Sequence, residues 1–116
     1  MFVQVALKSK DLFHPDVPSP EAPILREYKH WILGNVQGGR SYPLVVYQGP
    51  APPSVSPHRY IVLVYQQPGS LCFDEPRITN QTSNVFRYGF RVQSFIQKYN
   101  LRGPVCGTFF YGKANY

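Results

Sequence analysis

The sequence predicts a mainly β fold of the β-sandwich type, with one α-helix late in the chain. Twelve prolines and nine glycines among 116 residues interrupt the chain too often for a helical bundle. Residues 60–65 form an unbroken run of six strand-forming side chains, which is typical of a strand buried on both faces. The spacing of an amphipathic helix occurs over residues 90–101. The length is that of one domain.

Four segments are predicted to be strands and one to be a helix. The second strand ends before a Gly-Gly pair, the third ends at a Pro-Gly turn, and a Gly-Pro pair ends the helix. The predicted strands are Val3–Leu7, Tyr28–Val36, Arg59–Gln66 and Val105–Tyr111, and the predicted helix is Phe90–Leu101.

Two proline-rich segments, residues 15–23 and 49–57, are predicted to be loops. Proline has no backbone N–H to donate to a strand ladder, so neither segment suits a sheet interior. Because binding residues in β domains are concentrated on loops, a functional site is expected where these two segments meet the strands.

The charge pattern favours small anionic ligands. Twelve Lys and Arg residues against six Asp and Glu residues give a net charge of +6. These basic residues are spread from Lys8 to Lys113, whereas nucleic-acid-binding proteins usually gather theirs into a stripe or an arm. We therefore expect no nucleic-acid partner, but peripheral contact with an acidic membrane surface is compatible with the charge. A hydrophobic content of 43% excludes a disordered chain.

The cysteine content and the N-terminus predict a cytoplasmic protein. Cys72 and Cys106 are too few for a disulfide scaffold and are expected to be free thiols in a reducing compartment. The apolar residues 1–7 precede their lysines rather than follow them, so they do not resemble a secretory signal. No apolar run approaches the 18 residues that a spanning helix needs.

Three histidines are the main candidates for binding chemistry. His14 and His58 border the proline-rich loops, His30 lies in a predicted strand, and Asp16 is two residues from His14. Their spacing matches no compact metal site. In one interpretation the histidines are simply hydrogen-bonded, partly buried side chains. In the other, imidazole donors beside a carboxylate bind a phosphate-type head group and its amine. The neighbouring aromatic residues either pack or add a hydroxyl donor and a ring face: Tyr28, Trp31, Tyr47 and Tyr60.

Four short motifs in a fixed order make the sequence recognisable. They are Pro15-Asp16-Val17-Pro18-Ser19, Arg26-Glu27-Tyr28-Lys29-His30-Trp31, Tyr47-Gln48-Gly49-Pro50-Ala51-Pro52-Pro53 and His58-Arg59-Tyr60. In this order they resemble the signature of the phosphatidylethanolamine-binding proteins. That family includes the Raf kinase inhibitor proteins and the plant flowering regulators. The resemblance continues to the region of Tyr111.

The resemblance implies a sandwich of antiparallel sheets with a small anion pocket at one end. Family members bind phosphate-bearing head groups there, and some bind kinases or proteases. No catalytic activity and no cofactor or metal is implied. The positions that match pocket residues of the family are Asp16, Pro18, Tyr28, His30, Pro52, His58 and Tyr60.

The resemblance also implies additional N-terminal strands and a C-terminal helix beside the pocket. Residues 1–14 lack the apolar pattern expected before the first motif, so we predict a non-matching segment, 1–14, and a partial domain, 15–116. The chain thus resembles a family member truncated at both ends. Within the motifs, His14 replaces an acidic residue and Ala51 replaces a glycine.

Three functions are compatible with the sequence. The first is a module that binds phospholipid head groups or similar phosphate-type anions. The second is a regulatory protein that inhibits a kinase or a protease by surface contact. The third is an inactive, truncated paralogue.

Overall fold

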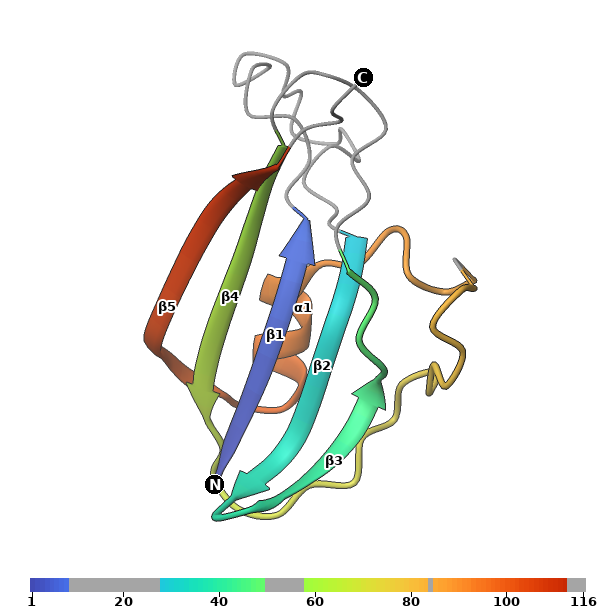
Figure 1. Cartoon of the computed structure of the whole chain (residues 1–116). Helices are drawn as coiled ribbons and strands as arrows, with labels where there is room; N and C mark the ends of the chain where they lie inside the picture. The colour runs from blue at the N-terminus through green and yellow to red at the C-terminus, as the bar shows by residue number, and fades with distance from the viewer. Residues whose placement is uncertain (9–27, 50–57, 84, 113–116) are drawn as a thin grey trace, which may run out of the picture.

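The described residues form one curved antiparallel sheet and one short helix. The computed structural model describes residues 1–8, 28–49, 58–83 and 85–112, and for His58 it describes the backbone. The sheet order is β3-β2-β1-β4-β5, and every neighbouring pair is antiparallel (Figure 1). The elements are β1 (Phe2–Lys8), β2 (Tyr28–Gln37), β3 (Arg40–Val45), β4 (His58–Gln66), α1 (Val92–Lys98) and β5 (Arg102–Gly112). The predicted mainly β, antiparallel fold with one late helix is confirmed.

The first predicted strand is confirmed and occupies the centre of the sheet. β1 pairs with β2 on one side and with β4 on the other. Val3, Val5 and Leu7 alternate with more polar positions and are almost fully buried on one face. Residues 2–8 are therefore an integral part of the sheet, although residues 1–14 lack the family pattern in their sequence.

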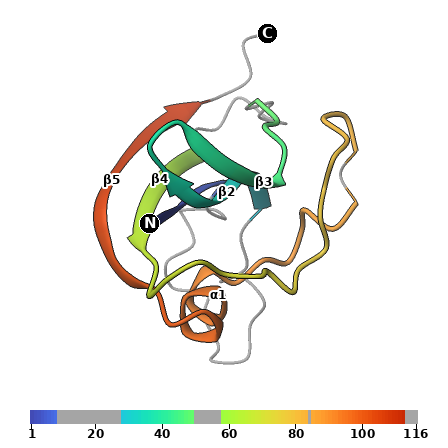
Figure 2. The same ribbon diagram turned by 90° about the horizontal axis from the view of Figure 1, so that it is seen from below.

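The core lies between the concave face of the sheet and a layer made by α1 and by residues 67–83 and 85–91, the covering segment (Figure 2). Burial of apolar surface there is the main stabilising term of the fold. The buried cluster includes side chains from β1, β2, β3 and β4, from the covering segment and from α1: Val3, Val5, Leu7, Ile32, Leu44, Val45, Tyr65, Ile78, Phe90, Phe95, Tyr99 and Leu101.

The helix is shorter than predicted. The periodicity predicted Phe90–Leu101 and an end at Gly103-Pro104, but α1 covers Val92–Lys98. Asn100 adopts a left-handed conformation with φ of 53°, a conformation that commonly terminates helices. Phe90, Tyr99 and Leu101 still point into the core from irregular backbone, which explains why their spacing resembled a longer helix.

β3 was not predicted, although the sequence contains a signal for it. Gly38 has φ of 60° and, with Gly39, makes the two-residue turn that joins β2 to β3 in a hairpin. Pro43 obscured the signal, because proline removes a ladder donor. It is tolerated here because β3 is an edge strand.

Burial of the long apolar strand differs from the prediction. In β4, Tyr60 and Tyr65 are buried, but residues 61–64 are only partly buried rather than covered on both faces. The neighbouring strand β5 is exposed along almost its whole length.

The described residues contain no helix that is long and apolar enough to cross a membrane. Cys72 and Cys106 are exposed free thiols, as predicted.

Candidate functional site

At one end of the sheet, the last residues of β1 and β5 lie beside the first residues of β2 and β4, and their side chains form a row. The register pairs Lys8 with both Tyr28 and Tyr60, and pairs Tyr60 with Phe110. Directly opposed residues of antiparallel strands share a face, and Lys8 follows the core residue Leu7 on β1, so these four side chains lie on the face opposite the core. The row thus combines an ammonium group, two phenols and a phenyl ring.

His30 lies next to this row and packs against both of its tyrosines. It is two residues from Tyr28 on β2 and therefore shares its face. Its ring centroid is 4.9 Å from that of Tyr28 and 5.3 Å from that of Tyr60, both with edge-on geometry. Tyr60 in turn stacks on Phe110 at 5.2 Å. The strand register therefore brings three of the predicted site residues into one cluster.

Gln48 fixes the orientation of the His30 ring. Nδ1 of His30 lies 2.8 Å from the carbonyl oxygen of Gln48, and the backbone N–H of Gln48 donates to the carbonyl of His30 at 2.8 Å. The hydroxyl of Tyr28 donates to Oε1 of the same Gln48 side chain. A carbonyl can only accept, so Nδ1 carries a proton, and Nε2 of the neutral ring is left as an acceptor. Gln48 was quoted in a motif but was not predicted as a site residue.

Two buried polar atoms at the cluster have no hydrogen-bond partner among the described residues. They are Nε2 of His30 and the hydroxyl of Tyr60. Buried polar groups are normally hydrogen-bonded, because leaving one unpaired costs about 1–3 kcal/mol. These two atoms therefore mark the point of the cluster that is suited to a polar ligand.

Burial sets the charge states of the cluster. Desolvation lowers the pKa of His30, and Lys8 and Arg87 lower it further, although the bond to the Gln48 carbonyl opposes the shift. Desolvation also raises the pKa of the Tyr60 hydroxyl, which stays a neutral donor, and lowers the pKa of Lys8. At neutral pH the cluster therefore offers a cation, a hydroxyl donor and a neutral imidazole.

We expect acid to destabilise the fold through His30. Its folded pKa lies below the ordinary value of 6.5, so in the interval between the two the unfolded chain binds more protons. Stability should fall as the pH drops through 6.5 toward the folded pKa, and this contribution should be constant below it. Thermal unfolding of the wild type and of His30→Gln between about pH 5 and 7.5 measures the difference. An identical pH slope in both proteins would contradict this assignment.

Arg87, which was not predicted as a site residue, holds the backbone of the site in place. Its side chain is fully buried, and its guanidinium donates to five backbone carbonyls. The bonds are 2.8 to 3.4 Å long and join β2, the residue after β3 and the covering segment. The acceptors are the carbonyls of Lys29, His30, Val46, Asn80 and Ser83. A single planar side chain thus fixes the position of the strand that carries Tyr28 and His30.

The remaining predicted site residues are only partly located. The backbone of His58 begins β4 opposite Gly112, at the same end of the sheet as the cluster. Trp31 contacts Tyr47 with ring centroids 5.4 Å apart. Asp16, Pro18 and Pro52 lie outside the described residues, as do His14 and Ala51. Within the described residues no three His, Cys, Asp or Glu side chains are grouped as metal ligands would be.

Comparison with known proteins identifies relatives of the chain. A family model described as phosphatidylethanolamine-binding protein matches residues 12–110. A relative from Drosophila melanogaster, named "Putative odorant-binding protein A5", is 41% identical over 101 residues, which are 83% of this chain and 47% of the relative. The chain thus spans about half the length of that relative.

A solved structure has the same fold. It is the structure of carboxypeptidase Y inhibitor complexed with the cognate proteinase, which matches with a TM-score of 0.64 and 25% identity. The match covers 98% of this chain and 60% of the other chain. The family model spans most of the sequence and all four of its motifs. The chain therefore belongs to the phosphatidylethanolamine-binding protein family.

Proposed function

We propose that the chain binds phosphate-bearing head groups, such as that of a phospholipid, at the cluster of Lys8, Tyr28, His30 and Tyr60. The observation that carries this proposal is the pair of buried atoms, His30 Nε2 and the Tyr60 hydroxyl, that lack partners among the described residues beside a lysine. A phosphate oxygen accepts from an ammonium and from a hydroxyl at the same time. Family membership supports the same ligand class.

Each group has a separate role in this proposal. Lys8 supplies charge, and the Tyr60 hydroxyl supplies a directed donor to a phosphate oxygen. His30 Nε2 accepts a hydrogen bond while the ring is neutral and donates one once the ring is protonated. By family resemblance, Asp16 would accept from the amine of the head group, and His58, Pro18 and Pro52 would complete the pocket. The role is binding rather than catalysis.

Tyr60→Phe should weaken phosphoethanolamine binding about tenfold or more, because a hydrogen bond to a charged group contributes about 1.5–3 kcal/mol. The fold should tolerate the change, since the variant removes a buried hydroxyl that has no partner among the described residues. The measurement is titration with phosphoethanolamine, followed by the NMR signals of the His30 ring. Tyr42→Phe is the matched control, because Tyr42 is exposed on β3. Unmoved His30 signals at millimolar ligand would contradict the proposal.

Phosphate binding should strengthen as the pH falls. Protonated His30 adds a second cation and a donor at Nε2, and a bound anion raises the pKa of His30 in return. Affinity should therefore rise as the pH approaches the lowered pKa of His30, and His30→Gln should lose this rise. A pH-independent affinity in the wild type would remove His30 from the site.

A second candidate function is inhibition of a proteinase or a kinase by surface contact. The likeness to carboxypeptidase Y inhibitor, which was solved with its proteinase, favours it. Capture of a proteinase or kinase that persists in His58→Ala and Asp16→Ala variants would support contact outside the pocket. Loss of capture in both variants would instead support a pocket-dependent role. A chain that shows no cooperative unfolding transition would fit an inactive paralogue.

A further inference from the structure

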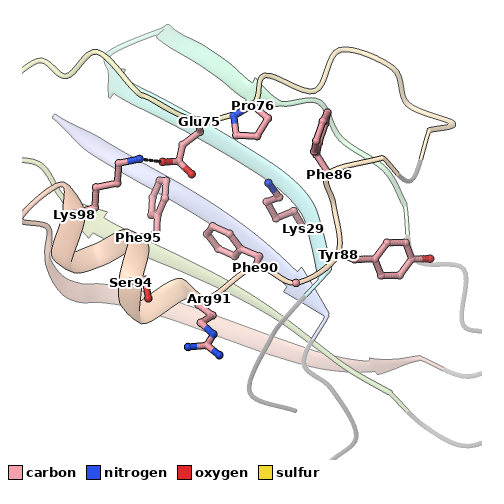
Figure 3. A pocket seen from close by; sticks show the side chains of 11 residues that line it. Lys29, Glu75, Pro76, Phe86, Tyr88, Phe90, Arg91, Ser94, Phe95 and Lys98 are labelled. Atoms are coloured by element: carbon pink, nitrogen blue, oxygen red, sulfur yellow. Dashed lines mark hydrogen bonds and ion pairs between the residues drawn. The ribbon is translucent and has the colours of Figure 1, made fainter. Parts of the chain in front are cut away.

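A groove lies on the face of the sheet opposite the cluster, between β2, α1 and residues 75–90 (Figure 3). Its volume is about 420 Å³, which is within the range of small-molecule sites. Lys29 follows Tyr28 and precedes His30 on β2, and successive strand residues point to opposite faces. The same strand therefore contributes His30 to the predicted pocket and Lys29 to this groove.

Lys29 is the unusual member of the groove. Its side chain is only 6% exposed, and its ammonium makes no hydrogen bond or ion pair with the residues that the structure describes. Its nearest recorded contact is the ring of Phe90, 5.4 Å from Nζ to the centroid. Desolvation lowers the pKa of Lys29. A buried ammonium without a hydrogen-bonded anion is costly, so an anion placed beside it would be stabilised.

Among the described residues that line the groove, the one carboxylate is already engaged. Oε2 of Glu75 accepts from Nζ of Lys98 at 2.7 Å and from the hydroxyl of Tyr99 at 2.7 Å. Figure 3 shows Glu75 directed toward Lys98, with Lys29 farther along the groove. Among the described residues, the lining of the groove contains three cations, Lys29, Arg91 and Lys98, and one carboxylate, Glu75, which is paired with Lys98. The lining therefore carries an excess of positive charge, which an anionic group placed beside Lys29 would offset.

The mouth of the groove next to Lys29 is aromatic and exposed. Phe86 is 64% exposed and Tyr88 is 69% exposed, whereas Phe90 and Phe95 form the buried floor. Phe86 also has a positive φ of 64°, an uncommon conformation for a bulky residue. Its ring lies at the mouth of the groove (Figure 3). Exposed rings around a partly apolar groove suit a hydrocarbon or aromatic ligand body.

We propose that this groove binds a small amphipathic carboxylate, with the carboxylate at Lys29 and the apolar body between Phe86 and Phe90. This site is distinct from the proposed head-group site on the opposite face, and neither proposal requires the other. The two sites are neighbours, because the ring of Tyr88 at the groove mouth lies 4.7 Å from that of Tyr28, centroid to centroid.

The test compares three eight-carbon ligands on the wild-type chain at neutral pH. Octanoate should bind at least tenfold more tightly than octan-1-ol, and octylammonium should not bind measurably. NMR shifts should centre on Lys29, Phe90 and Phe95. Equal affinities for octanoate and octan-1-ol, or shifts centred on His30 and Tyr60, would overturn the proposal without reference to any variant.

Two matched variants locate the site. Lys29→Met should reduce octanoate affinity to that of octan-1-ol, and Lys8→Met, which removes the same charge from the other face, should leave it unchanged. Phe86→Ala, at an exposed position, should weaken octanoate and octan-1-ol alike. Saturating phosphoethanolamine should not displace octanoate. Wild-type octanoate affinity in Lys29→Met would overturn the proposal, while failure of phosphoethanolamine binding alone would overturn only the head-group function.

Discussion

Arg87→Met is expected to lower the free energy of unfolding by about 3–5 kcal/mol, a large fraction of the stability of a domain of this size. The substitution keeps much of the apolar volume but removes the donors that serve five carbonyls. Those carbonyls belong to the backbone and cannot be replaced by apolar groups, so each loses a buried donor, although the carbonyl of His30 keeps its bond from the N–H of Gln48. Urea unfolding followed by circular dichroism measures the loss.

The matched control for Arg87 is Arg77→Met. Arg77 is exposed, donates one bond of 3.2 Å to the carbonyl of Pro43, and lies over the ring of Tyr42. Its loss should cost less than about 1 kcal/mol. Arg87→Lys keeps the charge but not the planar fork, and should therefore recover only a small part of the stability. An Arg87→Met protein within 1 kcal/mol of the wild type would show that water replaces the guanidinium readily.

Gly34→Ala is expected to lower the free energy of unfolding by about 1–3 kcal/mol through overpacking. A Cβ at this position would lie 2.6 Å from Cζ of Phe73 and closer still to Cε2. The Phe73 ring has little freedom to move away, because it packs against Tyr99 at 5.0 Å and stacks on Phe95 at 6.2 Å. Chemical denaturation measures the loss in the free energy of unfolding. The near-ultraviolet circular dichroism of the packed rings of Phe73, Phe95 and Tyr99 should also change.

Gly39→Ala controls for the change of residue type. A Cβ at Gly39 would meet no heavy atom within 4 Å, and its φ is not in the left-handed region. Stability should therefore change by no more than about 0.5 kcal/mol. If both variants behaved alike, contact with Phe73 would not be the reason that β2 carries a glycine at residue 34.

Local sequence patterns predicted four of the five strands, because the residues of these strands favour an extended conformation by themselves. Alternation and β-branched side chains located β1, β2, β4 and β5 to within a few residues. β3 was missed because Pro43 reads as a strand breaker, and only its place at the sheet edge makes it acceptable. The helix was extended too far because tertiary packing buries Phe90 and Leu101 on irregular backbone.

The candidate site was predictable only in part. Tyr28, His30 and Tyr60 were selected by their motifs, and the register of three strands brings them together. Lys8 could not be selected, because its place beside them depends on β1 pairing between β2 and β4. Arg87 could not be selected either, since its acceptors are carbonyls of distant residues, which leave no pattern of side chains in the sequence.

The two edges of the sheet are unequally protected against growth. β3 carries Pro43 and is bridged to the covering segment through Val45 and Ile78, so its outer edge is poorly suited to another strand. β5 is eleven residues long and pairs only with β4 among the described strands. It carries Pro104 near its start, but the remainder has no proline and exposes Phe109 and Tyr111. Its backbone is thus a template to which extended polypeptide can be added. Strand addition, and the self-association that follows from it at high concentration, should therefore favour the β5 edge over the β3 edge.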